Sequence, residues 1–432
     1  MKIKSIILSF LIFTYVQASE NSLNDLIDIA LENNTNISIS KLKAQNKKAT
    51  IGVSKSAYLP NLTAVGEVAN YNLDNSSVDN SGQVESITLS ASQLLYDFGK
   101  TMGSIAASKE DFEASINEII TTSSSTVLNV KNAYYNILNQ HRLIEVAKES
   151  VKIDELQLIQ ATEFFKAGVK TKIDVTNAQL QLSNSNLQLL KSTYDLKSAK
   201  TKFITILGKE DIRESFKIKK ENKNINNLSK DILQKETFIL DNLIDEAFNN
   251  RAELLVQKSL INFQREQYIS TKGDYFPTIS LKGNYKDSNA DSDISVLDKT
   301  EYSAGVYLEW NFFSGFKTKS NAKQKLTLLK TAKENLKFQE LSIIEEVTTS
   351  YYNVQQSIDS LEISILNVQL ANQNLELAQA RYINGLNDIV ELNDAKLDFI
   401  EAKNELVNTY YNYKTDLASL DYATGVIYSI KK

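Results

Sequence analysis

The sequence predicts a mainly α-helical protein with a small membrane-embedded β part, built from two tandem structural repeats. Three observations lead to this prediction. The second half of the 432 residues repeats the first at a constant offset, each half contains two segments of alternating polarity, and each half continues with two long heptad runs. The only two prolines, Pro60 and Pro277, mark that offset of 217 residues.

The composition excludes several classes of function. The net charge of −5 gives no basic surplus for nucleic acid. The chain has no cysteine, which rules out disulfides, thiolate metal sites and a lipid anchor on cysteine. With a single histidine, His141, no histidine metal site is expected; its repeat partner is Ile358, which indicates a packing role. We therefore expect no cofactor and no metal.

Residues 1–18 have the pattern of a secretory signal peptide. Lys2 and Lys4 precede the apolar run Ser5–Val16, and small residues favour cleavage after Ala18. The alternative is an N-terminal membrane anchor, but about a dozen apolar residues are too few for a bilayer that needs roughly 20. No later segment resembles a transmembrane helix, so we expect an exported protein that enters the membrane with strands.

The repeats define the expected domain boundaries: repeat 1 over 19–208, a charged, Asn-rich linker over 209–242, repeat 2 over 243–425, and a tail over 426–432. Tyr58-Leu59-Pro60 matches Tyr275-Phe276-Pro277 at the common offset. Each half should open with an amphipathic helix, over Leu23–Lys55 and Leu240–Lys272, that ends before its proline.

Two strands are expected after each proline, with polar turns at residues 74–77 and 287–289. The fourth strand has the clearest alternation, with one apolar face. This face comprises Tyr302, Ala304, Val306, Leu308, Trp310 and Phe312. Period-two alternation with aromatic residues near the strand ends is typical of membrane strands.

A long helical hairpin should follow in each half, because apolar residues recur every seven positions without a gap. The outgoing runs are Val130, Ile137, Ile144, Val151, Leu158, Phe165 and Val347, Val354, Leu361, Val368, Leu375, Tyr382. The returning runs are Val175, Leu182, Leu189, Leu196, Phe203 and Leu392, Phe399, Leu406, Tyr413, Leu420. Strict heptads predict coiled-coil packing. The first helix, Lys100–Lys166, should be about 100 Å long at 1.5 Å per residue.

Four membrane strands cannot close a barrel, and an open sheet edge in lipid leaves backbone groups without hydrogen bonds. The subunit must therefore oligomerise. A dimer gives eight strands, whose interior side chains fill, whereas a trimer gives twelve and leaves room for a lumen.

The signal peptide, the Tyr-Leu-Pro segment, the paired strand–strand–hairpin halves and the glycine-containing helix tips resemble the TolC family of outer-membrane efflux proteins. The resemblance covers residues 19–425, and its most specific parts are the tips at 165–178 and 381–395. It implies a homotrimer with a twelve-stranded outer-membrane β-barrel and a periplasmic α-barrel. It also implies a periplasmic adaptor (membrane fusion) protein as partner and an inner-membrane RND or ABC pump.

Gly168 and Gly385 each lie between two heptad runs, where a left-handed glycine ends a helix and lets the hairpin turn. Their apolar neighbours Val169 and Leu386 are candidates for the surface that docks the adaptor. The alternative is a purely structural role of both turns.

Glu391 and Asp394 stand three residues apart at the start of the last helix and share one face. They either complement the helix dipole or, as the resemblance implies, form a ring of six carboxylates at the tunnel constriction. Asp174 matches a position that in similar proteins pairs with a basic residue two places after the second tip glycine. That residue is Asn387 here, so closed-state locking must use Lys170, Lys172 or a hydrogen bond from Tyr382.

The function expected is a passive exit duct of a tripartite efflux pump or type I secretion system, opened by an iris-like movement of the tips. The rivals are a coiled-coil structural or adhesive surface protein and a standalone porin. The first does not explain the strands, and the second does not explain the long helices. No nucleophile–histidine pair and no phosphate-binding loop is present, so we do not expect an enzyme.

Overall fold

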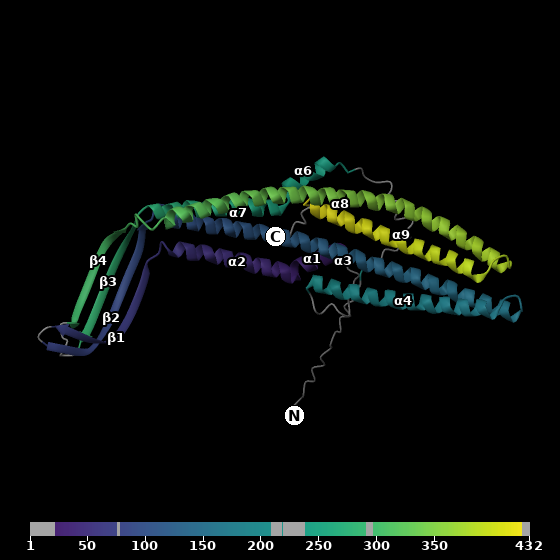
Figure 1. Ribbon diagram of the computed structural model, residues 1–432, viewed down its shortest axis with the longest axis horizontal. Coiled ribbons are helices and arrows are strands. Elements are labelled where there is room, and N and C mark those ends of the chain that lie inside the picture. The colour runs from purple at the N-terminus through teal and green to yellow at the C-terminus, as the bar shows by residue number, and fades with distance from the viewer. Residues whose placement is uncertain (1–21, 76–77, 209–217, 219–237, 291–296, 426–432) are drawn as a thin grey trace, which may run out of the picture. The chain divides into compact units, whose positions relative to one another are not determined.

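The computed structural model describes residues 22–75, 78–208, 218, 238–290 and 297–425 (Figure 1). The predicted signal peptide, most of the predicted linker and the C-terminal tail lie outside the described residues. The chain divides into two compact units. One unit comprises residues 1–35, 123–243 and 347–432, and the other comprises residues 36–122 and 244–346.

The strand-containing unit holds an antiparallel four-stranded sheet in the order β1-β2-β3-β4. The strands are β1 (Asn61–Asn75), β2 (Val78–Tyr96), β3 (Thr278–Ala290) and β4 (Lys299–Glu309). β1 and β3 begin directly after Pro60 and Pro277, as expected, because a proline is tolerated only where no ladder donor is needed. The central pairing joins the two repeats, with Leu89 of β2 opposite Tyr285 of β3.

The apolar face predicted for the fourth strand is exposed in a single chain at Tyr302, Val306 and Leu308. Two details of the strand prediction are wrong. The strand ends at Glu309, so Trp310 and Phe312 lie beyond it. The turn predicted at residues 287–289 lies inside β3, where Asp287 is opposite Thr300 of β4 and accepts a 2.6 Å hydrogen bond from its hydroxyl.

The opening helices of both repeats are broken once, whereas the sequence predicted each as continuous. The first half has α1 (Leu23–Asn33) and α2 (Thr35–Ser56), and the second has α6 (Leu240–Asn250) and α7 (Ala252–Lys272). The breaks, at Asn34 and Arg251, are 217 residues apart and both have extended backbone. Side-chain contacts hold each break: the Asn34 amide donates to the Ile206 carbonyl at 2.7 Å, and Arg251 pairs with Glu253 and Glu346.

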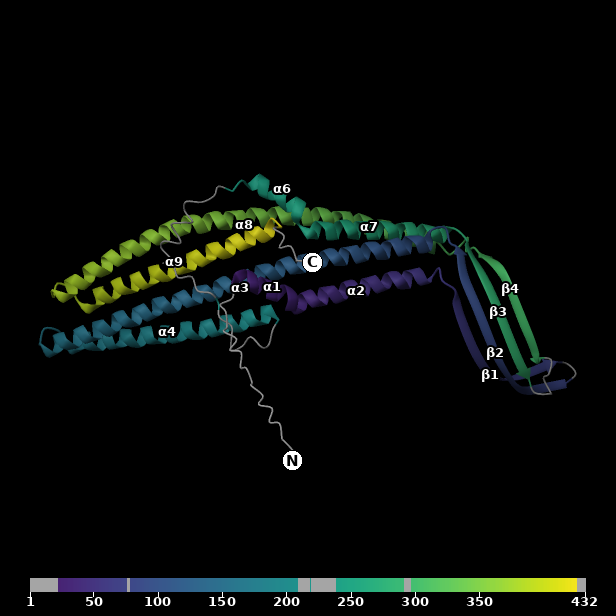
Figure 2. The ribbon, with the colours of Figure 1, turned by 180° about the vertical axis from the view of Figure 1, so that it is seen from behind.

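The long hairpins form as predicted. α3 (Lys100–Lys166) and α8 (Lys317–Ile383) each have 67 residues, and their returning partners are α4 (Lys172–Leu207) and α9 (Ile389–Ala423). Both ribbon views place α9 between α8 and α3, with α4 on the other side of α3 (Figures 1 and 2). None of the described helices is apolar enough over a sufficient length to cross a lipid bilayer.

The core of the helical unit is the heptad seam. All six residues of the α8 run, from Val347 to Tyr382, are buried. The last four of them, from Leu361 onward, form one cluster with Phe203, Leu406 and Tyr410. In the equivalent run on α3, the last residue, Phe165, is exposed although it continues the heptad. The helix ends one residue later at Lys166, and the neighbouring Phe164 takes the inward position against Tyr382, with ring centroids 6.1 Å apart.

Candidate gate and docking site at the helix tips

Both hairpin tips end in the same backbone motif. Gly168 and Gly385 have φ of 72° and 71°, the left-handed region that glycine adopts without a steric penalty. At the first tip the Gly168 amide donates to the Phe165 carbonyl at 3.0 Å, and the Val169 amide donates to the Phe164 carbonyl at 2.9 Å. At the second tip the Gly385 and Leu386 amides donate to the Tyr382 and Arg381 carbonyls at 3.1 and 2.8 Å. This is the Schellman arrangement that satisfies the last helix carbonyls.

The side chains of Val169 and Leu386 are exposed. No side chain or backbone atom lies within 4 Å of a Cβ built on either tip glycine. The left-handed backbone, and not a lack of space, therefore requires glycine here. The result is an apolar residue at the apex of each hairpin, held by a rigid turn.

The returning helices begin with carboxylate caps. Asp174 accepts hydrogen bonds from the Thr171 amide at 3.0 Å and the Thr171 hydroxyl at 2.7 Å. Asp388, which the sequence analysis did not single out, accepts from the Val390 and Glu391 amides at 3.1 Å. Each cap satisfies donors that a helix N-terminus leaves unpaired. The Asx-type pattern Asn387-Asp388 before an apolar run could have identified the second cap.

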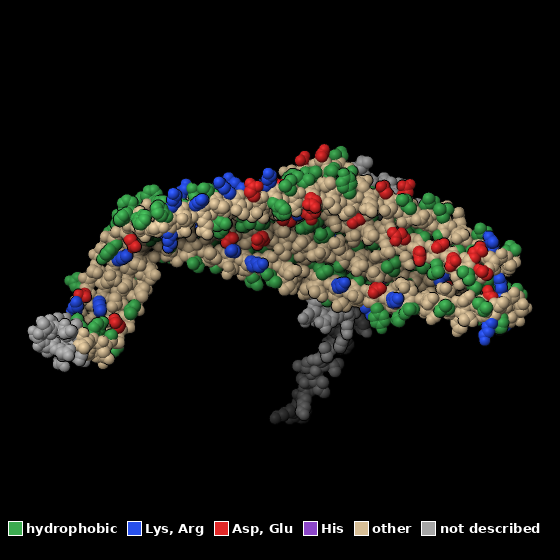
Figure 3. Space-filling view, in the orientation of Figure 1, with side chains coloured by type: hydrophobic (Ala, Val, Ile, Leu, Met, Phe, Trp, Pro, Cys, Tyr) green, Lys and Arg blue, Asp and Glu red, His purple; other side chains and the backbone are tan. Residues whose placement is uncertain are grey.

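Glu391 and Asp394 both lie exposed on the first turns of α9. The guanidinium of Arg381 is 3.7 Å from the Glu391 carboxylate, and both side chains are about half exposed, so this ion pair is weak. Acidic side chains are also numerous over the tip half of the helices in the space-filling view (Figure 3). Both acids therefore remain accessible to solvent in a single chain.

Tyr382 is the largest fully buried side chain of the tips. Its ring is fully covered, and its hydroxyl has no hydrogen-bond partner among the described residues. Burial raises the pKa of the Tyr382 phenol, and the nearby Asp174 carboxylate raises it further. The phenol therefore stays protonated at neutral pH.

Lys170 joins the two tips. Its ammonium donates to the Asn387 carbonyl at 3.0 Å and lies 4.6 Å from the centre of the Tyr382 ring, a cation–π contact. Lys170 and Asn387 are repeat equivalents, 217 residues apart. Of the three alternatives for a latch, Lys170 makes the contact between tips, whereas Tyr382 contributes its ring and not a hydrogen bond. Lys172 is exposed.

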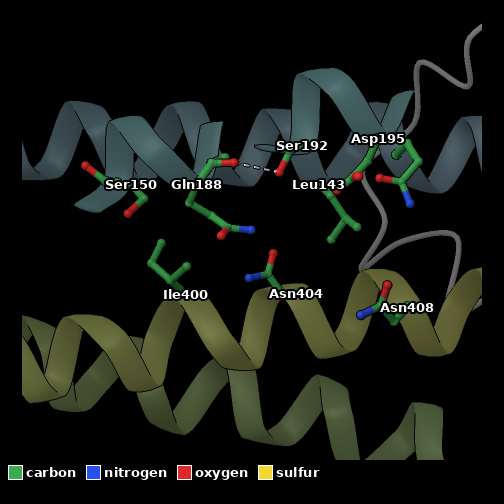
Figure 4. A pocket seen from close by; sticks show the side chains of 11 residues that line it. Leu143, Ser150, Gln188, Ser192, Asp195, Ile400, Asn404 and Asn408 are labelled. Atoms are coloured by element: carbon green, nitrogen blue, oxygen red, sulfur yellow. Dashed lines mark hydrogen bonds between the residues drawn. The ribbon is translucent and has the colours of Figure 1, made fainter. Parts of the chain in front are cut away.

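Farther from the tips, α3, α4 and α9 enclose a pocket of about 260 Å³ (Figure 4). Gln188 and Asn404 point from opposite helices into the space between them, next to Leu143 and Ile400. Amides and hydroxyls dominate the lining, and Asp195 is its single titratable group. The pocket therefore has no acid–base pair for catalysis.

Solved structures with a similar fold include bacterial outer-membrane channels. The CmeC outer membrane channel of Campylobacter jejuni matches with a TM-score of 0.78 and 17% identity, over 95% of this chain and 87% of that one. The open state of the MtrE outer membrane channel of Neisseria gonorrhoeae matches with a TM-score of 0.71 and 17% identity, over 93% and 88%. The fold is thus that of outer-membrane channels built from long helical hairpins and a four-stranded sheet.

Curated relatives agree with this class. Outer membrane protein TolC of Salmonella enteritidis is 24% identical over 397 residues, which cover 89% of this chain and 78% of the relative. TolC of Vibrio cholerae is 23% identical over 379 residues, with coverage of 87% and 84%. The profile of the outer membrane efflux protein family matches residues 26–209 and 243–426. The chain belongs to the outer membrane efflux protein family, and the predicted two repeats and outer-membrane efflux channel are confirmed.

Proposed function

We propose that three copies of this chain form the exit duct of a tripartite efflux pump or type I secretion system in the outer membrane. The strands of three subunits build one twelve-stranded barrel, and the hairpins build a tunnel on the periplasmic side. The sheet supports this assembly because β1 and β4 are its edges, and an edge in lipid needs a partner strand.

The observation that carries the proposal is a difference between equivalent residues of the two repeats. Leu190 and Tyr194 on α4 are 53% and 59% exposed, whereas their equivalents on α9, Val407 and Tyr411, are 4% and 3% exposed. On α8, Ile363 is 60% exposed, whereas its α3 equivalent Val146 is 8% exposed.

The buried members of these pairs lie on the two helices, α3 and α9, that face each other inside one chain. The exposed members lie on α4 and α8, the two outer helices of the layer (Figure 1). A second copy that places its α4 against α8 of the first reproduces the internal junction and covers these side chains. Repetition of that contact around three chains gives six hairpins in a closed ring.

The tips are the gate and the docking site of this duct. Val169 and Leu386 present apolar apices to a periplasmic adaptor protein, while Glu391 and Asp394 from three chains place six carboxylates around the opening. Lys170, held on Asn387 and on the ring of Tyr382, keeps the two tips of one chain together in the closed state. Conduction is passive and needs no catalytic group. The pump behind the adaptor is of the RND or ABC class.

The assembly is tested by the mass of the purified protein. Extracted from outer membranes in detergent, the native chain should have the mass of about three subunits after subtraction of bound detergent. Reconstitution in planar bilayers should give ion conductance. A stable, strand-containing monomer contradicts the proposed trimer.

A further inference from the structure

A pocket of about 170 Å³ lies where the sheet of the strand-containing unit meets its helices. It is bounded by the short helix η2 (Gly273–Tyr275) and by the segment that joins β4 to α8. Four aromatic side chains line it and are between 55% and 84% exposed: Trp310, Phe312, Phe313 and Phe316. The Trp310 indole donates a hydrogen bond to the Tyr275 carbonyl at 3.2 Å, which orients its ring. The pocket is therefore an open aromatic hollow with one ring held in place.

This pocket continues the apolar face of the sheet. Val306 and Leu308 belong to that face of β4, and Trp310 and Phe312 extend the same two-residue alternation just beyond the strand. The apolar face of a membrane sheet contacts acyl chains, and tryptophan is enriched where the apolar region of the bilayer meets the headgroups. The pocket therefore lies at the level of the lipid headgroups.

Basic residues follow the pocket directly. Residues 317–337 of α8 contain seven lysines and one glutamate, whereas the equivalent residues 100–120 of α3 contain two lysines and four acids. Basic side chains gather over this part of the helices in the space-filling view (Figure 3).

Lys319 brings this charge into the pocket, and Lys323 follows one turn later on the same face of α8. Both lysines are exposed, and neither forms an ion pair with a residue that the structure describes. The acid of the lining, Asp274, is paired with Lys100 at 2.7 Å. The pocket therefore has an uncompensated positive charge beside an aromatic wall.

The first repeat has the same junction without these side chains. Phe312 and Lys319 correspond to Leu95 and Met102. Leu95 and Met102 stay exposed although β2 pairs with β3 and α3 contacts α7 within the chain. A neighbouring copy in the equivalent position therefore leaves the pocket of the second repeat open, and each chain has one such pocket.

We propose that this pocket binds an anionic glycerophospholipid, one molecule per chain. The phosphodiester lies on Lys319 and Lys323, and the acyl chains lie against Trp310 and Phe312. A lipid with one net negative charge matches the unpaired lysines, because lysines next to a membrane attract anionic headgroups. Only the choice of the periplasmic leaflet rests on the function proposed above. The site itself requires the sheet to be in the membrane and does not depend on the trimer.

Trp310 is the single tryptophan of the chain, so its fluorescence reports on the pocket. The native protein is reconstituted into vesicles of phosphatidylethanolamine and phosphatidylglycerol in varied proportion. One of the two lipids carries brominated acyl chains, which quench an indole on contact. We expect the quenching to give phosphatidylglycerol an affinity at least fivefold that of phosphatidylethanolamine. Equal affinities, or no quenching by either lipid, overturn the inference.

Lys319→Met tests the charge, because it introduces the residue that the first repeat has at this position. The preference for phosphatidylglycerol should fall below twofold. Lys330→Met is the matched control, since Lys330 is an exposed lysine of the same helix about 16 Å from Lys319. This distance exceeds the Debye length of about 8 Å, so the preference should stay. A preference that survives Lys319→Met, or that both variants lose equally, overturns the site.

The number of bound lipids is a separate measurement. Native mass spectrometry of the detergent-solubilised protein should show one retained phosphatidylglycerol per chain, whatever the oligomeric state. Trp310→Gln should lower the retained fraction at least threefold. It introduces the residue of the first repeat, where Gln93 donates to the Tyr58 carbonyl as Trp310 does to that of Tyr275. Retention unchanged by this variant places the lipid elsewhere and overturns the inference, whereas a mass other than that of three chains contradicts only the trimer.

Discussion

The exposed Tyr194 ring offers the sharpest test of the contact between chains. Tyr194 is 59% exposed and its equivalent Tyr411 is 3% exposed, so an equivalent junction removes 56% of the residue surface from water. For an aromatic residue of about 200 Å², this is about 110 Å². At about 25 cal/mol per Å², the contribution is about 3 kcal/mol per junction and about 8 kcal/mol per trimer.

Tyr194→Ser should therefore weaken the assembled trimer without unfolding the chain, because the residue is not part of the core of one subunit. Thermal dissociation of the trimer in detergent, followed on a semi-native gel, measures this effect. Ile159→Ser is the matched control, since Ile159 is also 59% exposed but its equivalent, Glu376, is exposed as well. Equal dissociation temperatures of the two variants would refute the proposed junction.

Three further predictions concern the tips. Val169→Asp with Leu386→Asp should abolish export and leave trimers and membrane insertion intact, because only the docking apices change; export that survives both changes excludes these tips as the adaptor's contact. Glu391→Ala with Asp394→Ala should lower cation preference and weaken block by trivalent cations in single-channel recordings, at a folding cost below about 1 kcal/mol per residue; unchanged selectivity would leave both acids as helix-start residues. Lys170→Met should raise resting conductance severalfold, since the ammonium contact with the Asn387 carbonyl and the Tyr382 ring is lost, whereas Lys172→Met, at an exposed position, should not.

At the tips, the sequence predicted the residue types involved but not the contacts between the two hairpins. The sequence shows that Asn387 stands where similar proteins have a basic residue. It offers Lys170 as one of three candidates for the closed-state latch, with Lys172 and Tyr382. Only the coordinates show that Lys170 contacts Asn387, because these residues belong to different hairpins and meet only through the packing of the tips. The cap residue Asp388 was not predicted, although the local pattern Asn387-Asp388 before an apolar run contains its signal.

The breaks at Asn34 and Arg251 show a different limit. The amphipathic pattern was read as continuous through both positions, so the sequence predicted unbroken helices. The breaks depend on contacts with residues far along the chain, at Ile206 and Glu346. Such contacts override local helix preference, which is worth less than about 1 kcal/mol per ordinary residue.

The sequence by itself determined the two repeats, the long hairpins, the four strands and the glycine turns, because each follows from spacing along the chain: a 217-residue offset, periods of seven and of two, and local capping chemistry. The tertiary structure alone decided which faces of the hairpins meet. It showed that Asp154 and Lys396, 242 residues apart, form a buried ion pair, and that Tyr194 and Tyr411 occupy equivalent positions with opposite exposure. The physical reason is that a heptad specifies a seam within one hairpin, whereas contacts between hairpins also depend on polar residues, such as Asp154 and Lys396, that follow no period.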